Sequence, residues 1–394
     1  MNDLATRAAQ VLKDNDRGEH TVPSPKLYPH QWAWDSAFAA IGWAHVDRGR
    51  ALAELRRLMG SAWPDGRVPH IYFDPDATGY WPDASFWGTT DSSSITQPPV
   101  WGTAAWRLFE LGVDGEGLRP LVPAIEASHA FFRRARDPNG WGLVAVVHPW
   151  ESGLDNCPVW DEPLSQIDPA DAPPFVRRDV NHVADPAERP TDDHYKRYAV
   201  IVKAIADDDF GPGPFAVYDP LMTACLARSE HDLARLCDAL SIETDAAARA
   251  ARIAEALERL WDDELGRYRY VDANGGALTA DVVGGYLPLI LEDLPAERRA
   301  RLDAGLSARF DTPYPVPSTA LSDPAFDPRR YWRGPTWLNI DWLLAPHASL
   351  PLKERALELA DRVGFREYYH PLTGEGLGAD QFTWSAALVL DWLA

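Results

Sequence analysis

Apolar residues return every three or four positions along much of the chain, which is the period of an amphipathic helix. The clearest runs are ALAELRRLMG, WGTAAWRLFELG, AIEASHAFFRRAR, YKRYAVIVKAIAD and AAARAARIAEALERLWDD, at residues 51–60, 101–112, 124–136, 195–207 and 246–263. The N-terminal segment 1–18 alternates charged with small apolar residues and predicts a first helix. Strand-like alternation is short and rare, so the pattern predicts an all-α protein.

The connections between these helices are alternately short and long. Two of the long ones are rich in proline, glycine and aromatic residues, at residues 62–83 and 168–190. Helices joined in this way suggest hairpins arranged in a closed ring, with the long loops gathered at one end. We expect function to reside in those loops. No domain boundary is evident, so we expect one domain over residues 1–394, with a lid-like insert at about 160–192.

Composition and charge exclude several classes of function. The formal net charge is −21, which argues against binding to nucleic acid or to an anionic membrane, because phosphate groups would be repelled. Cys157, Cys225 and Cys237 are too few for a disulfide framework, and segment 1–18 has no continuous apolar core. We therefore expect a cytoplasmic protein without a membrane span. The oligomeric state cannot be read from the sequence, and a homo-oligomer is possible.

Seventeen tryptophans are the compositional anomaly. Sugar rings stack on aromatic planes, so an aromatic-lined sugar pocket is one use for so many indoles, and a bulky helical core is the other. The histidines never fall into HExxH or a comparable ligand cluster, and there is no GxSxG elbow or nucleotide-binding glycine fingerprint. We therefore expect no metal and no cofactor.

Four segments combine acids with aromatic residues. The segment YPHQWAWDSAF places Asp35 where it could either cap a helix or clamp sugar hydroxyls. The segment HPWESGLDNCPVWDEP brings four acids close to Trp150 and Trp160, and one acid held protonated in an apolar pocket would suit a general acid. The four acids are Glu151, Asp155, Asp161 and Glu162.

The other two segments lie towards the C-terminus. In RRYWRGPTWLNIDWLL we expect Pro335 in the first turn of a helix and Gly334 close to a ligand. In FREYYHPLTGEGLGADQFTWSAALVLDWL, Glu367 and Glu375 flank a turn, and spacing alone leaves either as a catalytic base. Glycoside hydrolysis needs at least two carboxyl groups, and these segments supply them on different loops.

These segments, in this order and together with RPTDDHYKRY, resemble glycoside hydrolase family 63, and particularly its bacterial mannosylglycerate and glucosylglycerate hydrolases. The resemblance runs from Tyr28 to Trp384. It implies an (α/α)6 barrel that hydrolyses an α-linked sugar with inversion. The chain is short for the family in its N-terminal third, which leaves the aglycone side of the pocket open to variation.

The resemblance also implies roles for single residues. Asp155 corresponds to the general acid and Glu367 to the general base, with Glu375 as the alternative base. Arg189 and Tyr195 fall where relatives hold the carboxylate of glycerate, a sensible use of a guanidinium fork. The sugar subsite would be formed by Tyr28, Trp32, Trp34, Asp35, Gln97, Tyr331, Trp332 and Trp337.

The best expectation is therefore hydrolysis of a 2-O-(α-glycosyl)-D-glycerate. Three alternatives remain: an α-glucosidase acting on a disaccharide such as trehalose or on a short oligosaccharide, a sugar epimerase, and a catalytically silent sugar-binding protein. An epimerase would need histidine pairs at the mouth of the barrel, where this sequence has carboxylates. Glucose and mannose cannot be distinguished at this level.

Overall fold

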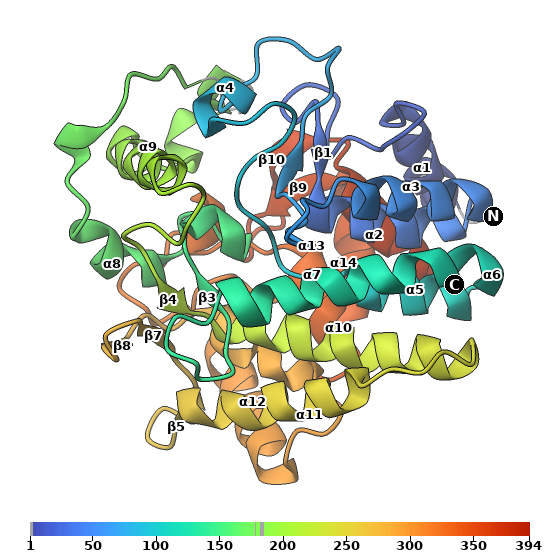
Figure 1. Ribbon diagram of the computed structural model, residues 1–394. Helices are drawn as coiled ribbons and strands as arrows, with labels where there is room; N and C mark the ends of the chain where they lie inside the picture. Colours follow the sequence, from blue (N-terminus) through green and yellow to red (C-terminus); the bar gives the residue numbers. More distant parts are fainter. Residues whose placement is uncertain (1–2, 178, 182–184) are drawn as a thin grey trace.

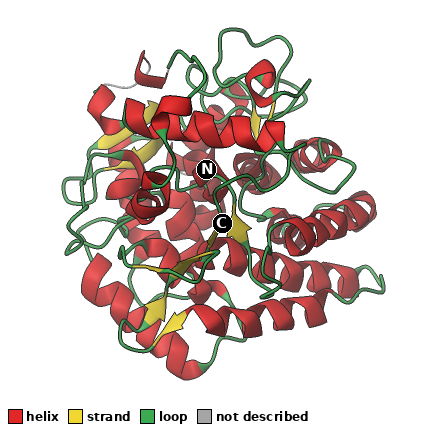
Figure 2. Cartoon of the chain, turned by 60° about the vertical axis from the view of Figure 1, so that its left-hand side comes forward, coloured by secondary structure: helices red, strands yellow, loops and turns green. Residues whose placement is uncertain are grey.

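The computed structural model describes residues 3–177, 179–181 and 185–394. Helices make up most of it, and the strands are short pieces within the loops (Figure 2). Each of the helical runs predicted from periodicity forms a helix, so the all-α prediction is confirmed.

Two layers of helices, an inner ring and an outer set, form the body of the molecule. In Figure 1 several of the long helices lie side by side across the view. Among the described residues, six helices contact one another in a closed inner ring: α2 (Ala33–Ala44), α5 (Trp101–Glu110), α10 (Pro220–Ala239), the 3-10 helix η8 (Val283–Ile290), α13 (Leu338–Leu344) and α15 (Thr383–Leu393). Six others pack outside them: α1 (Asp3–Asp14), α3 (Arg48–Gly60), α7 (Val122–Ala135), α11 (Ala246–Leu257), α12 (Ala296–Phe310) and α14 (Leu352–Val363). Outer and inner helices alternate along the chain, as a ring of hairpins requires.

The amino-acid pattern explains which helices lie inside. Every residue of α2 (AWDSAFAAIGWA) is buried, as expected of a helix that is apolar on all sides. The outer helix α14 (LKERALELADRV) buries only one stripe, formed by Leu352, Ala356, Leu359 and Ala360. In the inner ring, a Cβ at Gly42 would lie 2.5 Å from Ala387 of α15, so glycine permits the close packing of these two helices.

The remaining elements belong to the loops. The short helices are α4 (Ala84–Trp87), α6 (Gly115–Leu118), α8 (Asp161–Ser165) and η1 (Arg119–Leu121), η2 (Pro149–Ser152), η3 (Pro158–Trp160), η4 (Pro169–Asp171), η5 (Asp179–Asn181), η6 (Pro186–Glu188), η7 (Glu258–Leu260) and η9 (Tyr331–Arg333), and the long one is α9 (Asp192–Asp207). The predicted insert at 160–192 thus forms several short helices before α9. Its residues 178 and 182–184 lie outside the described part of the chain.

The strands pair only locally. The antiparallel pairs are β1 (Gln31–Trp32) with β2 (Ile71–Tyr72), β5 (Trp261–Asp262) with β6 (Arg267–Tyr268), and β9 (Arg366–Tyr369) with β10 (Gly376–Asp380). A four-stranded sheet has the order β3 (Ala145–Val146), β4 (Val217–Tyr218), β7 (Tyr270–Asp272) and β8 (Ala277–Leu278). In the described residues, no helix is both long enough and apolar enough to cross a bilayer.

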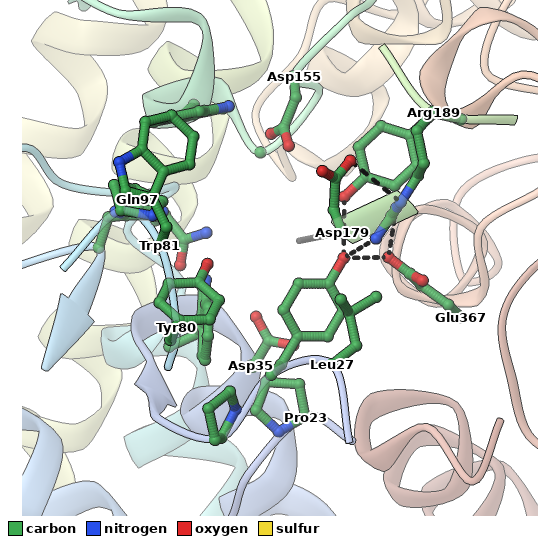
Figure 3. A pocket seen from close by; sticks show the side chains of 18 of the residues that line it. Pro23, Leu27, Asp35, Tyr80, Trp81, Gln97, Asp155, Asp179, Arg189 and Glu367 are labelled. Carbon is green, nitrogen blue, oxygen red and sulfur yellow. Dashed lines mark hydrogen bonds and ion pairs between the residues drawn. The ribbon is translucent and has the colours of Figure 1, made fainter. Parts of the chain in front are cut away.

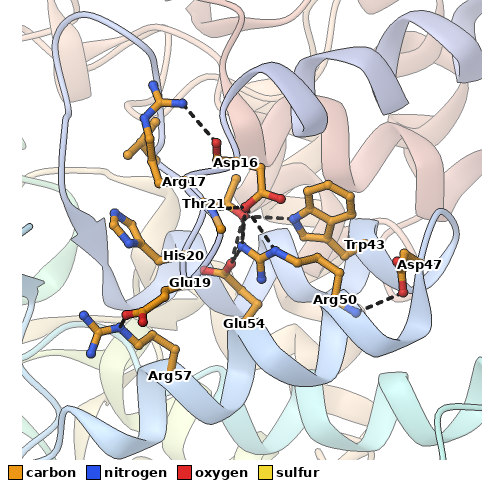
Figure 4. Close-up of polar contacts among 12 residues, drawn as sticks. Asp16, Arg17, Glu19, His20, Thr21, Trp43, Asp47, Arg50, Glu54 and Arg57 are labelled. Carbon is orange, nitrogen blue, oxygen red and sulfur yellow. Dashed lines mark hydrogen bonds and ion pairs between the residues drawn. The ribbon is translucent and has the colours of Figure 1, made fainter.

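A buried polar network ties the N-terminal loop to the barrel (Figure 4). The carboxylate of Glu54 on α3 is fully buried and accepts hydrogen bonds from Thr21 (2.8 Å), Ser36 (2.7 Å) and Arg50 (2.7 Å). Thr21 also accepts a hydrogen bond from the indole of Trp43 at 2.9 Å. Because a buried carboxylate is costly without partners, this network holds the loop that precedes β1 in one position.

Candidate active site

A cavity of about 370 Å³ opens among the long loops (Figure 3). The loop before α2, the loop after β2 and the segments before α5, after η2, before α9, around η9 and after β10 all contribute to its wall. Of the residues predicted for the site, the following line it: Tyr28, Trp32, Trp34, Asp35, Gln97, Asp155, Arg189, Tyr195, Tyr331, Trp332 and Glu367. Segments separated by more than 300 residues thus meet at one cavity.

Asp155 follows η2 in a turn that is held from several sides. Its backbone carbonyl accepts a hydrogen bond from Tyr198 (2.8 Å), and the next residue, Asn156, accepts one from the backbone N–H of Trp332 (3.0 Å). Gly153 (φ +72°) begins this turn, and a Cβ there would lie 2.5 Å from the Trp34 ring. The turn therefore packs directly on the indole wall of the cavity.

The environment of Asp155 favours its neutral form. Burial raises its pKa from the ordinary value of 3.8 to about 8, Arg189 opposes this shift, and Glu367 adds to it. A carboxyl group with such a pKa is mostly protonated at neutral pH, which is the state that a general acid needs before it acts.

Glu367 lies on β9 and is almost completely buried, with 1% of its surface exposed. Its Oε2 accepts a hydrogen bond from the backbone N–H of Ala379 (2.9 Å), and its Oε1 accepts one from the Tyr28 hydroxyl (2.7 Å). The Nη1 of Arg189 reaches the same Oε1 at 3.3 Å. A Cβ at Gly378 (φ +63°) would lie 2.6 Å from Oε2, so glycine on β10 leaves room for this carboxylate.

Asp35 is the third residue of α2 and points into the cavity (Figure 3). It does not cap the helix, since Trp32 occupies the N-cap position without a side-chain hydrogen bond. Burial, followed by the negative charge of Glu367, raises the pKa of Asp35 well above its ordinary value. A protonated Asp35 can donate one hydrogen bond and accept another, as a clamp on sugar hydroxyls requires.

Indole rings form the apolar wall. Trp332 lies 6.3 Å from Trp34 between ring centroids, and Trp384 meets Trp34 edge-on at 5.5 Å. Trp337 stacks on the back of Trp332 at 3.7 Å with an interplanar angle of 4°. The prediction that Trp337 lines the subsite is therefore corrected: it supports Trp332 from behind.

Arg189 is buried, with 3% of its surface exposed, although it precedes a helix in a polar loop. Its Nη2 donates to the Tyr28 hydroxyl at 2.6 Å, and its guanidinium lies over the Tyr331 ring at 4.5 Å. Tyr195 lies close by, with the Arg177 guanidinium 4.0 Å from its ring centroid. The structure thus brings the two predicted carboxylate-binding residues to the same cavity as the two catalytic candidates.

Glu375 lies outside the cavity, which corrects its prediction as a site residue. Its side chain is 53% exposed and pairs with Arg329 through both carboxylate oxygens, at 2.6 and 3.1 Å. This ion pair lowers the pKa of Glu375. A carboxylate on the surface with no access to the cavity is not placed to activate a water molecule there.

Two of the three remaining acids of the 148–163 segment are paired with arginines, and the third is exposed. Glu151 is fully buried and accepts hydrogen bonds from Arg136 at 2.7 to 3.1 Å. Asp161 pairs with both terminal nitrogens of Arg333, at 2.9 and 2.5 Å. Glu162 is exposed. Of the four acids, only Asp155 faces the cavity.

Two expectations for the 329–344 segment were wrong. The helix α13 begins at Leu338, so Pro335 precedes it instead of forming its first turn. Gly334 packs against backbone, since a Cβ there would collide with the carbonyl oxygen of Asp327. That glycine serves the fold of the loop and not the approach of a ligand.

The sequence did not reveal several lining residues. Tyr80 and Trp81 come from the aromatic connector at 62–83, and Asp179 comes from the 168–190 loop. Trp150 and Trp384 also line the cavity. The aromatic residues carried a signal in their unusual density within a loop, whereas Asp179 was one of many acids in a polar segment.

A protein-family model describes this constellation. Residues 28–385 match the mannosylglycerate hydrolase MGH1-like glycoside hydrolase domain. The chain belongs to this family. It is 41% identical to the mannosylglycerate hydrolase of Thermus thermophilus, over 98% of this chain and 99% of that one, and 34% identical to the glucosylglycerate hydrolase of Mycolicibacterium hassiacum, over 99% and 97%.

Solved structures agree with the sequence comparison. A family 63 mannosylglycerate hydrolase of Thermus thermophilus, crystallised in complex with Tris and D-glycerate, superimposes with a TM-score of 0.95 at 41% identity, covering 99% of this chain and all of that one. The predicted (α/α)6 barrel is thereby confirmed. The neutral trehalase Nth1 from Saccharomyces cerevisiae (TM-score 0.61, 15% identity, covering 95% of this chain and 73% of that one) shares the fold alone.

This family 63 chain is a glycoside hydrolase, which settles the choice against an epimerase or a silent binding protein. The acids that line its cavity are either neutral at neutral pH or paired with a cation. Asp35 and Asp155 have raised pKa values and favour the neutral form. Glu367 is balanced by Arg189 at 3.3 Å, and Asp179 is balanced by Arg177, which lies behind the wall at 2.7 Å.

One further cation, Lys26, lines the cavity and is exposed. Within the described residues the cavity therefore carries no excess of negative charge, although the chain as a whole has a net charge of −21. Such a cavity can admit an anionic ligand.

In the described part of the chain, no three histidine, cysteine, aspartate or glutamate side chains lie close enough together to hold a metal ion.

Proposed function

We propose that this protein hydrolyses a 2-O-(α-glycosyl)-D-glycerate with inversion at the anomeric carbon. The observation that carries the proposal is a partly buried acid with a raised pKa, Asp155, in one cavity with a buried carboxylate, Glu367, and a buried guanidinium, Arg189. The names of the relatives, mannosylglycerate hydrolase and glucosylglycerate hydrolase, support the same substrate class.

In the proposed reaction Asp155 protonates the glycosidic oxygen as the bond to the anomeric carbon breaks. Glu367 removes a proton from a water molecule that attacks from the opposite face, which releases a β-configured sugar. In inverting enzymes the two carboxyl groups stand about 6.5–9.5 Å apart so that this water fits between them. After the reaction Asp155 has lost its proton and Glu367 has gained one, and both residues return to their starting states by exchanging protons with solvent.

The sugar would be held between the indole wall and Asp35. The Trp34 and Trp332 rings offer planes for the C–H faces of the ring, and a protonated Asp35 offers one donor and one acceptor to its hydroxyls. Arg189 and Tyr195 would hold the carboxylate of the aglycone, and the charge balance of the cavity supports an anionic group there.

The test is to incubate the purified protein with mannosylglycerate, glucosylglycerate and trehalose and to follow the released sugar by proton NMR in the first minutes. We expect early β-anomer from a glycosylglycerate. Early α-anomer would contradict inversion. Turnover of trehalose alone would support the disaccharide glucosidase instead.

A pair of variants tests the identity of the base. Glu367→Gln should lower kcat by about 10²–10⁴-fold, the usual contribution of general acid–base catalysis. Glu375→Gln removes a surface carboxylate that lies only eight positions away and should leave kcat within about twofold of the wild type, in line with the small effect of exposed ion pairs. A larger loss in Glu375→Gln than in Glu367→Gln would reverse the assignment.

We also propose a reducing, cytoplasmic location, because Cys157, Cys225 and Cys237 are all buried free thiols. The predicted lid role of the 160–192 segment stays a prediction, although Asp179, Arg189 and the adjoining Pro190 from that segment line the cavity. The possible homo-oligomer and the absence of nucleic-acid binding also stay predictions.

A further inference from the structure

Arg189 is the point at which the catalytic carboxylate and the aglycone region meet. Both of its terminal nitrogens have partners within the protein: Nη1 donates to Glu367 Oε1 at 3.3 Å, and Nη2 donates to the Tyr28 hydroxyl at 2.6 Å. Its Nε is buried without a hydrogen-bond partner, and the nearest acid, Asp179, is 3.9 Å away. Since a guanidinium carries five N–H groups, Arg189 keeps one further N–H on each of its three nitrogens.

The carboxylate of the proposed base, Glu367, accepts hydrogen bonds from the same group of residues. Glu367 Oε1 accepts from Tyr28 and Arg189, and Oε2 accepts from the backbone of Ala379. A carboxylate has about four lone-pair sites, so three of the four are taken before a water molecule arrives. Figure 3 shows Arg189 and Glu367 together on one side of the cavity, with Asp155 towards the top of the view.

A carboxylate binds a guanidinium best as a fork on two neighbouring nitrogens. Whichever edge of Arg189 it takes, the fork must include at least one terminal nitrogen that now serves Glu367 or Tyr28. It also brings a second negative charge to the cation beside the base. An arriving carboxylate therefore shares the positive charge of Arg189 with Glu367, and the Arg189–Glu367 contact at 3.3 Å, the longer of the two that Arg189 makes, is the one it would weaken.

We propose that the aglycone carboxylate of the substrate activates the enzyme as well as binding to it, by drawing Arg189 away from Glu367 and so freeing that carboxylate to take a proton from water. This inference rests on the proposed function and adds regulation to it. An Arg189 that merely held the substrate would affect binding only. In our proposal the carboxylate raises the rate of the chemical step.

Glycosyl fluorides separate the two roles. In an α-mannosyl or α-glucosyl fluoride the leaving group is a single atom, so the aglycone region stays open. The C1–F bond breaks, water adds at C1, and its proton passes to Glu367, while fluoride leaves without needing protonation by Asp155. The rate of fluoride release therefore reports on the base alone, and D-glycerate can be added separately as the free carboxylate.

We expect D-glycerate to raise the kcat of fluoride release in a saturable manner by about tenfold, the factor expected for the release of one charge-assisted hydrogen bond. Glycerol, the matched neutral compound, should leave it unchanged. Simple inhibition by D-glycerate, or equal effects of D-glycerate and glycerol, would overturn the proposal. The wild-type protein alone decides this point, so the result does not depend on the folding of any variant.

The variant Arg189→Gln gives a second, independent readout. It should lower kcat/KM for the glycosylglycerate, raise the rate of fluoride release without glycerate by about tenfold because the cation beside Glu367 is gone, and abolish the stimulation by D-glycerate. The matched control is Arg355→Gln, which removes a surface arginine paired with Asp311 and should behave as the wild type. Parallel losses on both substrates in Arg189→Gln would indicate a merely structural role and contradict the proposal.

The two proposals fail in different ways. If no glycosylglycerate is hydrolysed, the proposed function is wrong. If glycosylglycerate is hydrolysed but D-glycerate does not stimulate fluoride release, the function stands and the coupling through Arg189 is wrong.

Discussion

The substitution Asp155→Asn should abolish activity and at the same time stabilise the folded protein. Burial raises the pKa of Asp155 from 3.8 to about 8, so the folded state binds a proton that the unfolded state releases between these pH values. The stability of the wild type consequently falls as the pH rises from about 4 to about 8. Asparagine resembles the neutral acid and carries no such dependence.

The size of the effect follows from the shift. At 1.36 kcal/mol per pH unit, the interval from 3.8 to about 8 corresponds to at most about 6 kcal/mol. Asp155 lies on an open cavity, and water reaching it screens much of this amount, so we expect about 1–3 kcal/mol at pH 8. For 394 residues that raises Tm by about 1–3 °C.

Calorimetric unfolding at pH 5.5 and pH 8.5 measures this difference. The stabilisation in Asp155→Asn should be larger at pH 8.5 than at pH 5.5, while kcat on an unactivated glycoside falls by about 10²–10⁴-fold. The control is Asp161→Asn, because Asp161 is paired with Arg333 and its pKa is lowered. The ionised Asp161 carboxylate stabilises the folded protein at every pH above the pKa that Asp161 has in the unfolded chain. Both test pH values lie above that pKa, so Asp161→Asn should lower Tm at both.

A stabilisation that does not grow with pH, or an Asp155→Asn variant less stable than the wild type at pH 8.5, would refute the reasoning. Either result would mean that Asp155 is ionised in the folded protein at neutral pH. It would then be unsuited to act as the general acid.

Three further outcomes are expected. The kcat/KM of the wild type should fall above about pH 8 as Asp155 loses its proton, and a profile that stays flat to pH 10 would contradict the acid assignment. Gly378→Ala should lower kcat with an unchanged Tm to within a few degrees, because the new Cβ would lie 2.6 Å from Glu367 Oε2; kinetics equal to wild type would show that β10 can move aside. Glu54→Ala should cost about 2–4 kcal/mol of unfolding free energy, since it removes the acceptor of the Thr21 and Ser36 hydroxyls and one of the two acids paired with Arg50; urea unfolding measures this, and a change under about 1 kcal/mol would indicate that the loop rearranges.

The helices could be predicted because their signal is local. A stripe of apolar residues such as Leu352, Ala356 and Leu359 is visible in a few turns of sequence, and packing then selects the same helix. The starting point of α13 could not be predicted, because Pro335 and Thr336 pair through their backbones with Ser318 and Tyr369, which lie in distant segments without periodicity.

The site was predictable only in part, for a related reason. Glu367 and Glu375 lie in one acidic, glycine-rich segment, and their spacing did not distinguish them. The β9–β10 pairing does: Glu367 lies within β9, against the backbone of Ala379, whereas Glu375 lies in the turn beyond the strand, where Arg329 pairs with it. Such a difference arises from strand register, which the residue types alone do not specify.

The acids of the 148–163 segment show why partners matter more than position. Glu151 and Asp161 each have an arginine from another segment at bidentate distance, and carboxylates paired in this way hold the fold. Asp155 lies between them in sequence but shares the cation nearest to it, Arg189, with Glu367 and with the aglycone region. Burial without a cation of its own raises the pKa of Asp155 and favours its neutral form. No local pattern encodes this lack of a cation, and in the proposed mechanism it is what makes Asp155 available to donate a proton.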